Sequence, residues 1–260
     1  MIRRTLAEKL REAADLFPVV TVTGPRQSGK TTLVRSEFKG YEYVSLELPD
    51  QRAFALEDPR GFLAQFDGPV VLDEAQRAPD LFSYVQVLVD ERDRPGQFIL
   101  TGSQNFLLLQ TISQSLAGRC AVLHLLPLSL GEVLRRDPLR LDRFGTDLRR
   151  GVGAPRRSLE EVLFTGFYPR IHDKRLPPHD WLGSYYQTYL ERDVRNVLNV
   201  GDLETFGRFV GLCAGRNGLP PEIVVASTVS LRVRSKTGTL KVWISGLPSW
   251  PSEGAASRAT

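Results

Sequence analysis

A lysine and a hydroxyl residue behind a glycine-rich turn form the strongest chemical signal in this chain. The segment from Gly24 to Thr31 reads G-P-R-Q-S-G-K-T and fits the pattern G-x-x-x-x-G-K-[ST] at every position. Glycines let backbone N–H groups approach a polyphosphate, and the following helix presents its positive N-terminus to the same anion. We expect Lys30 to carry charge to the β- and γ-phosphates and Thr31 to coordinate Mg²⁺. The predicted phosphate-binding residues are Gly24, Pro25, Arg26, Gln27, Ser28, Gly29, Lys30, Thr31 and Thr32.

Two adjacent acids follow a short apolar segment further along the chain. Asp73 and Glu74 come directly after Val70-Val71-Leu72. In this position we expect Asp73 to hold the magnesium through water and Glu74 to orient or deprotonate an attacking water. Adjacent acids after a strand also cap helices or solvate turns, but the phosphate-loop pattern upstream favours the catalytic interpretation.

A polar cluster ends the next apolar segment, Phe98–Thr101. We expect Ser103 to reach the γ-phosphate and the attacking water, with Thr101 and Asn105 as rivals for this role. Ser103 or Asn105 is equally suited to capping the helix that follows, and the two roles are compatible.

These residues need strands and helices to position them. Short apolar segments rich in β-branched residues alternate with helical patterns, which predicts an α/β fold with a parallel sheet covered on both faces. The expected strands are Val19–Thr23, Tyr43–Leu48, Val70–Asp73, Phe98–Thr101 and Ala121–Leu125. The expected helices are Thr5–Phe17, Gly29–Phe38, Pro59–Phe66, Asp80–Arg92 and Asn105–Ala117.

The second half of the chain changes character. Residues 135–158 carry eight arginines against three aspartates together with glycines and prolines, which indicates a solvated linker or, as an alternative, a phosphate-binding segment. Residues 159–218 read as a small helical domain, with helices expected at Leu159–Phe164, Asp180–Val200 and Asp202–Ala214. We therefore divide the chain into residues 1–134, this linker, the helical domain and a tail, 219–260.

Composition excludes several classes of protein. Apolar residues make up 42% of the 260 residues and charged residues 25%, which excludes collagen and extensive disorder. No apolar stretch approaches the ~20 residues of a membrane span, and the polar N-terminus lacks a signal core, so we expect a cytoplasmic protein without a membrane partner. Cys120 and Cys213 are then expected to be buried thiols rather than a bridge. The net charge of 34 − 30 = +4 permits DNA as a partner without demonstrating it.

Several of these segments together resemble a known family, the AAA-like prokaryotic ATPases with a C-terminal domain of unknown function. The resemblance covers roughly residues 1–218. It rests on Phe17–Thr32, Asp73–Pro79, Gly96–Ser103, Ser115–Arg119 and Tyr189–Val194. It implies a P-loop sheet of order 5-1-4-3-2, with glutamate after aspartate as in the ATPases that use a catalytic glutamate.

The resemblance also implies that Arg119 lies near the nucleotide. A guanidinium group there would neutralise transition-state charge at the γ-phosphate. Alternatively, Arg119 stabilises the C-terminal end of the preceding helix.

The tail departs from the family pattern, which usually continues with a winged-helix segment and a nuclease-like domain. Residues 236–245 weakly resemble the second helix of a helix-turn-helix, a remnant of that segment. The tail is rich in Ser, Pro and Gly and holds only Glu222 and Glu253 as acids. We expect a truncated or frameshifted segment without a fold of its own; a short hairpin from Ile223–Val233 and Leu240–Ile244 is the alternative.

The sequence therefore predicts a protein that binds ATP with Mg²⁺ and hydrolyses ATP. Its catalytic candidates are Lys30, Glu74, Ser103 and Arg119, and its metal ligands are Thr31 and Asp73. The alternative is a nucleotide-dependent switch or DNA-associated regulator with slow turnover. A homo-oligomer is compatible with the family resemblance.

Overall fold

The protein is described from a computed structural model that covers residues 2–103, 115–136, 158–189, 230–234 and 241–245. The chain divides into two compact units, residues 1–181 and residues 182–260. Each unit is described by itself.

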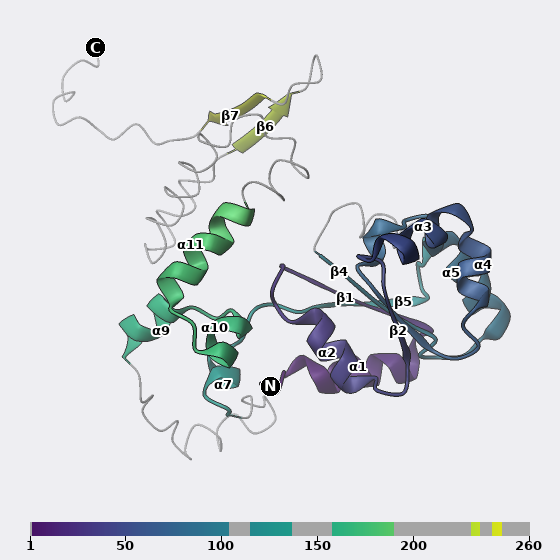
Figure 1. Ribbon diagram of the computed structural model, residues 1–260, viewed down its shortest axis with the longest axis horizontal. Helices are drawn as coiled ribbons and strands as arrows, with labels where there is room; N and C mark the ends of the chain where they lie inside the picture. The colour runs from purple at the N-terminus through teal and green to yellow at the C-terminus, as the bar shows by residue number, and fades with distance from the viewer. Residues whose placement is uncertain (1, 104–114, 137–157, 190–229, 235–240, 246–260) are drawn as a thin grey trace, which may run out of the picture. The chain divides into compact units, whose positions relative to one another are not determined.

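A five-stranded parallel sheet forms the centre of the first unit (Figure 1). Its strands lie in the order β2-β3-β4-β1-β5, which confirms the predicted order 5-1-4-3-2 read from the other edge. The strands are β1 (Val19–Gly24), β2 (Glu42–Ser45), β3 (Val70–Asp73), β4 (Phe98–Ser103) and β5 (Cys120–His124). Every residue of β1 and β3 is buried, as expected for inner strands of a sheet that helices cover on both faces.

Helices cover both faces of this sheet (Figure 1). One face packs against α1 (Leu6–Leu16) and α2 (Lys30–Glu37). The other face packs against α3 (Pro49–Glu57), α4 (Pro59–Ala64) and α5 (Leu81–Arg92), with the short 3₁₀ helix η1 (Ala75–Arg77) beside them. The predicted α/β architecture is therefore confirmed.

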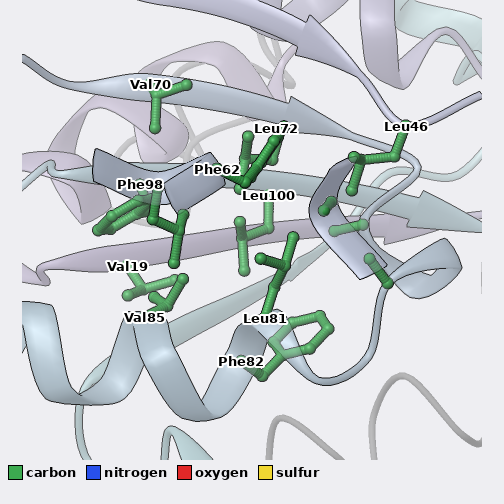
Figure 2. Packing of buried hydrophobic residues seen from close by; sticks show 14 of the residues in the cluster. Val19, Leu46, Phe62, Val70, Leu72, Leu81, Phe82, Val85, Phe98 and Leu100 are labelled. Carbon is green, nitrogen blue, oxygen red and sulfur yellow. The ribbon is translucent and has the colours of Figure 1, made fainter. Parts of the chain in front are cut away.

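The larger core lies between the sheet and α3–α5. Figure 2 shows Leu100 of β4 between Leu72 of the neighbouring strand β3 and Leu81 of α5, and all three belong to one buried cluster. Phe62 is fully buried in this cluster and makes edge-on ring contacts with Phe54 and Phe66. This packing holds β3 and β4 rigidly, and both strands end in residues of the candidate site.

Among the described residues of the first unit, three α-helices were not predicted. They are α3, α7 (Leu130–Val133) and α10 (Pro169–Lys174). The expected strand Tyr43–Leu48 is shorter, because β2 ends at Ser45 and the chain turns into α3 at Pro49. The predicted helix Asn105–Ala117 lies almost wholly outside the described residues.

Helix α9 (Leu159–Thr165) confirms the first helix of the predicted helical domain. Both α9 and α10 fall within the same unit as the sheet, where the Leu128 N–H donates to the Phe167 carbonyl at 2.8 Å. Helix α11 (Pro178–Tyr189) begins the predicted helix Asp180–Val200 two residues early. The remainder of that helix, the helix Asp202–Ala214 and most of the linker lie outside the described residues.

In the second unit, β6 (Ser230–Arg234) and β7 (Lys241–Ser245) form an antiparallel pair with Leu231 opposite Ile244. The hairpin alternative for this segment is therefore confirmed at these residues. The helical interpretation of residues 241–245 is wrong, because Val242, Trp243 and Ile244 are residue types that favour a strand over a helix. Among the described residues, no helix is long and apolar enough to cross a membrane.

Candidate functional site

The phosphate-loop motif lies between the end of β1 and the start of α2. Gly24 has φ +148°, and a Cβ atom there would lie 2.1 Å from the Leu125 carbonyl oxygen, so only glycine fits. Gly29 has φ +94° and forms the N-cap of α2. Glycine has no side chain that could cap the helix. The first backbone N–H groups of α2 therefore face the loop without a hydrogen bond from an N-cap side chain.

Lys30 is buried at the first position of α2 and bends back over the loop. Its ammonium group donates to the carbonyl oxygens of Gly24 and Pro25, each at 3.0 Å. Burial lowers the pKa of Lys30, while the nearby charges of Glu74 and Asp73 act in the opposite direction. The lysine charge is thus held inside the loop, where polyphosphate oxygens would meet it.

The Asp73 carboxylate is the hydrogen-bonding centre of the site. Thr31 Oγ1 lies 3.2 and 2.9 Å from its two oxygens, Oδ1 and Oδ2. The Tyr43 hydroxyl donates to Oδ2 at 2.7 Å, and the Thr101 hydroxyl donates to Oδ1. Strands β2, β3 and β4 and helix α2 therefore all contribute a residue to one buried carboxylate.

Tyr43 is a residue of the site that the sequence did not predict. Its ring lies under the Arg35 guanidinium group, 4.7 Å from the ring centroid. Burial, and next the hydrogen bond to Asp73, raise the pKa of the Tyr43 hydroxyl, so it remains a donor to the carboxylate. In the sequence, Tyr43 indicated only a β-strand, because aromatic residues favour strands.

The paired oxygens of Thr31 and Asp73 suit Mg²⁺. This ion prefers oxygen ligands and is usually held by one or two protein groups together with substrate phosphates and water. The 2.9 Å approach of these two side chains beside the loop places two such oxygens together. The residues present therefore fit a magnesium ion that arrives with a polyphosphate.

Glu74 follows Asp73 in a left-handed backbone conformation, with φ 57° and ψ 41°. This conformation is uncommon for a residue with a side chain. Its N–H donates to the Thr101 hydroxyl at 3.3 Å, and its carboxylate accepts a hydrogen bond from the Gln76 side-chain amide. The Glu74 backbone thus contacts the Asp73 cluster through Thr101, while the Glu74 carboxylate contacts Gln76.

Ser103, the last residue of β4, lies beside Glu74 and Gln76. The Gln76 amide nitrogen lies 3.2 Å from Ser103 Oγ, so one amide joins Ser103 and Glu74. Thr101 is fully buried and is engaged by Asp73 and the Glu74 N–H. Asn105 lies outside the described residues.

Arg119 lies elsewhere in the molecule. It precedes β5, and its carbonyl oxygen accepts from Val19 N–H at the start of β1. The phosphate loop follows the other end of β1, about 16 Å away at the usual rise per residue of a strand. Its guanidinium group makes a bidentate ion pair with Asp90 of α5. Arg119 thus lies at the end of the sheet opposite the phosphate loop of its own chain, because parallel strands all begin at that end.

Arg4, which the sequence did not predict as a site residue either, supports the phosphate loop through hydrogen bonds. Its guanidinium group is buried and donates to the Ser28 carbonyl at 2.7 Å and the Leu126 carbonyl at 2.6 Å. Its Nε lies 3.2 Å from Glu132 Oε1. The same carboxylate accepts from the N–H groups of Thr5 and Ser129.

A groove of about 810 Å³ lies beside the Arg4–Glu132 ion pair. Its lining includes Arg4, Lys9, His124, Leu126 and Tyr168. The His124 ring lies 2.6 Å from the hydroxyl of Thr23, the residue before the loop. The groove therefore adjoins the phosphate loop through both Arg4 and His124.

Two family models match this chain in sequence. A family model described as an AAA domain matches residues 16–134, and one described as a domain of unknown function (DUF8612) matches residues 156–249. The second match covers the predicted helical domain and continues past residue 218 into the segment that we interpreted as a tail.

Two mycobacterial proteins are similar in sequence. The uncharacterized protein Rv2008c of Mycobacterium tuberculosis and the uncharacterized protein Mb2031c of Mycobacterium bovis are each 35% identical over 196 residues. The matched region is 75% of this chain and 40% of each relative. The chain thus spans about 40% of the length of these relatives.

Solved structures show weaker likeness. The Walker-type ATPase PABY2304 of Pyrococcus abyssi is 17% identical at a TM-score of 0.42, covering 83% of this chain and 73% of its own. AMPPCP-bound DnaA from Aquifex aeolicus is 16% identical at 0.40, covering 86% and 71%. The Thermotoga maritima RuvB Holliday junction branch migration motor is 16% identical at 0.40, covering 93% and 92%.

Proposed function

We propose that this chain, whose residues 16–134 belong to the AAA domain family, binds ATP with Mg²⁺ and hydrolyses it. The observation that carries the proposal is the convergence of the phosphate loop with Asp73. One end of the sheet holds a buried lysine, an uncapped helix N-terminus and a carboxylate paired with Thr31. These are the groups that a magnesium-bound triphosphate requires.

In this proposal the loop residues Gly24 to Thr32 surround the phosphates. Lys30 supplies charge to the β- and γ-phosphates, and the backbone N–H groups at the start of α2 supply further donors. The neighbouring groove takes the base and sugar of the nucleotide, because it adjoins the loop at Arg4 and His124.

Thr31 and Asp73 would hold the magnesium ion. The ion would neutralise charge on the β- and γ-phosphate oxygens as a Lewis acid. Hydrogen bonds from Tyr43 and Thr101 fix the Asp73 carboxylate, so that its position does not depend on the ion alone.

Glu74 is the proposed general base. It adjoins Asp73, and its carboxylate is joined through Gln76 to Ser103, the proposed contact to the γ-phosphate. A carboxylate in this position accepts a proton from water as the water attacks phosphorus. Lys30 and Ser103 would stabilise the charge on the transferred group.

The test replaces Glu74 with glutamine. Glu74→Gln nearly preserves shape but removes the proton acceptor, so we expect phosphate release to fall by at least about 100-fold. Binding of ATP, measured by calorimetry, should change less than about threefold. Glu47→Gln is the matched control, because Glu47 is an exposed acid that follows the neighbouring strand and pairs with Arg77.

Phosphate release at the wild-type rate in Glu74→Gln would remove Glu74 from the mechanism. No phosphate release from the wild-type protein, despite tight ATP binding, would instead favour the alternative function, a nucleotide-dependent switch or DNA-associated regulator. The arginine-rich segment 135–158 supports that alternative through its charge. The release assay is therefore run with and without duplex DNA, at two salt concentrations.

A further inference from the structure

Gln76 is the one described side chain that hydrogen-bonds both Glu74 and Ser103. Its amide nitrogen donates to Glu74 Oε2 and lies 3.2 Å from Ser103 Oγ. Glu74 follows β3 and Ser103 ends β4, so the amide connects the ends of two neighbouring strands. Nothing in the phosphate-loop or acidic patterns of the sequence assigns a role to this residue.

This arrangement carries a cost for the amide itself. The carbonyl oxygen of Gln76 is buried and has no hydrogen-bond partner among the described residues. An unsatisfied buried acceptor is unfavourable. Turning the amide over would give that oxygen the Ser103 hydroxyl as a donor, but would also set it against the Glu74 carboxylate. The observed orientation therefore favours the contact with Glu74 over satisfaction of the amide.

The turn that carries Gln76 does not need its side chain. The 3₁₀ helix η1 is closed by backbone hydrogen bonds from Arg77 N–H to the Glu74 carbonyl at 3.0 Å and from Ala78 N–H to the Ala75 carbonyl at 3.2 Å. Ala75 and Ala78 anchor it in the core. The side-chain amide is thus available for a task other than folding the turn.

We propose that Gln76 is a positioning residue for ATP hydrolysis, whose amide fixes the Glu74 carboxylate relative to Ser103. Ser103 contacts the γ-phosphate. Because the Gln76 amide binds both Ser103 and Glu74, the position of Ser103 determines the position of the Glu74 carboxylate. The Glu74 carboxylate then faces the attacking water only when Ser103, at the end of β4, contacts the γ-phosphate. This inference rests on the proposed function and adds to it a specific coupling between two of its residues.

The test removes the two hydrogen bonds while keeping the length of the side chain. Gln76→Met keeps a flexible unbranched chain of similar size. Gln76→Glu keeps the shape but sets a second carboxylate against Glu74. For each variant we expect kcat for ATP hydrolysis to fall about 10- to 100-fold, the usual effect of removing a group that orients a functional ligand. The KM for ATP and the calorimetric affinity should change less than about threefold.

Gln97→Met is the matched control. The side-chain carbonyl oxygen of Gln97, like that of Gln76, is buried and has no hydrogen-bond partner in the part of the chain that the structure describes. The Gln97 amide donates to the Arg94 carbonyl at 2.8 Å. It precedes β4, at the edge of the sheet opposite Ser103. Its substitution should leave kcat unchanged, which separates the coupling from the general cost of losing a buried amide.

A double variant tests the route through Ser103. If the amide connects Ser103 to Glu74, Gln76→Met combined with Ser103→Ala should lose no more than about threefold beyond the larger single loss. Losses that multiply would overturn the coupling, as would a Gln76→Met kcat within threefold of wild type or a loss confined to KM. Should Gln76→Met fail to melt cooperatively, Gln76→Glu decides the question. A wild-type protein without ATPase activity would instead contradict the proposed function itself.

Discussion

At the scale of single residues, the site is organised around two buried charges. Asp73 is surrounded by donors from Thr31, Tyr43 and Thr101, so its carboxylate is satisfied and fixed. Lys30 donates only to neutral loop carbonyls in the contacts described, and burial lowers its pKa. A buried ammonium ion gains most from an anionic partner, and a polyphosphate would supply that partner.

Lys30→Ala should therefore weaken ATP binding strongly. The variant removes the full positive charge that reaches into the loop, and we expect the affinity to fall at least about 100-fold, or roughly 3 kcal/mol. Calorimetric titration with Mg-ATP measures this. Lys39→Ala, at an exposed lysine beyond the end of the same helix, should bind normally. Affinity close to wild type in Lys30→Ala would show that the loop does not hold phosphates.

The residues of the phosphate loop could be predicted because they are contiguous and their spacing is dictated by one ligand. Asp73 and Glu74 could be predicted because acids at the end of an apolar strand are conspicuous. Tyr43, Gln76 and Arg4 could not, because each has a hydrogen-bond partner far away in the sequence. The separations are 30 residues for Tyr43 and Asp73, 27 for Gln76 and Ser103, and 128 for Arg4 and Glu132. Such contacts follow from the strand order and the packing of the turns rather than from any local pattern.

At the scale of elements, a buried ion pair connects the N-terminal segment, the phosphate loop and α7. Arg4 and Glu132 are 7% and 8% exposed. Burial raises the pKa of Glu132, but hydrogen bonds from the Ser129 and Thr5 N–H groups and the charge of Arg4 outweigh it and lower the pKa overall. The ionised carboxylate therefore contributes to stability through three separate partners.

Glu132→Gln should lower the free energy of unfolding in a pH-dependent way. The folded pKa of Glu132 lies below its ordinary value of 4.5, so the stabilisation is present above pH 4.5 and is lost as the pH falls through the lowered pKa. We expect a deficit on the order of 1–3 kcal/mol at pH 7 that shrinks at acid pH. Urea unfolding at pH 7 and at successive values below 4.5 measures it.

Glu161→Gln is the matched control for that comparison. Glu161 closes the same Ser-x-x-Glu capping box with Ser158, but it lies on an exposed helix. Because glutamine also serves in this capping position, its stability should stay within about 0.5 kcal/mol of wild type. If Glu132→Gln lowers the free energy of unfolding equally at all pH values, hydrogen bonding alone, and not the charge of Glu132, stabilises this contact with Arg4, Thr5 and Ser129.

The strands and most helices of the first unit could be predicted from their apolar pattern, whereas α3 could not. Its apolar residues are contiguous, from Ala53 to Leu56, rather than spaced at helical intervals. Only Ala55 is buried, while Phe54 and Leu56 remain 40% and 47% exposed. Packing of this one alanine against the core, together with Pro49 at the first turn, fixes a helix that the sequence pattern does not display.

At the scale of the whole molecule, the strand order separates two groups of residues. Strand β1 lies between β4 and β5, so the loop after β1 is flanked by the end of β4, where Ser103 lies. Arg119 precedes β5 and lies at the opposite edge, paired with Asp90. A contribution of Arg119 to hydrolysis therefore requires the nucleotide of a second copy of the chain.

Arg119→Ala should accordingly leave ATP affinity within about twofold of wild type, since the residue does not reach its own phosphate loop. Any loss of turnover should be recovered by mixing Arg119→Ala with Glu74→Gln, because an intact arginine on one chain then meets an intact glutamate on the other. That recovery should disappear on dilution, as expected for a contact between subunits. Asp90→Ala is the control for loss of the ion pair itself. Reduced affinity in Arg119→Ala, or a rate loss that mixing does not restore at any protein concentration, would contradict this prediction. An unchanged rate would leave Arg119 only as the exposed ion-pair partner of Asp90, a contact that contributes little to stability.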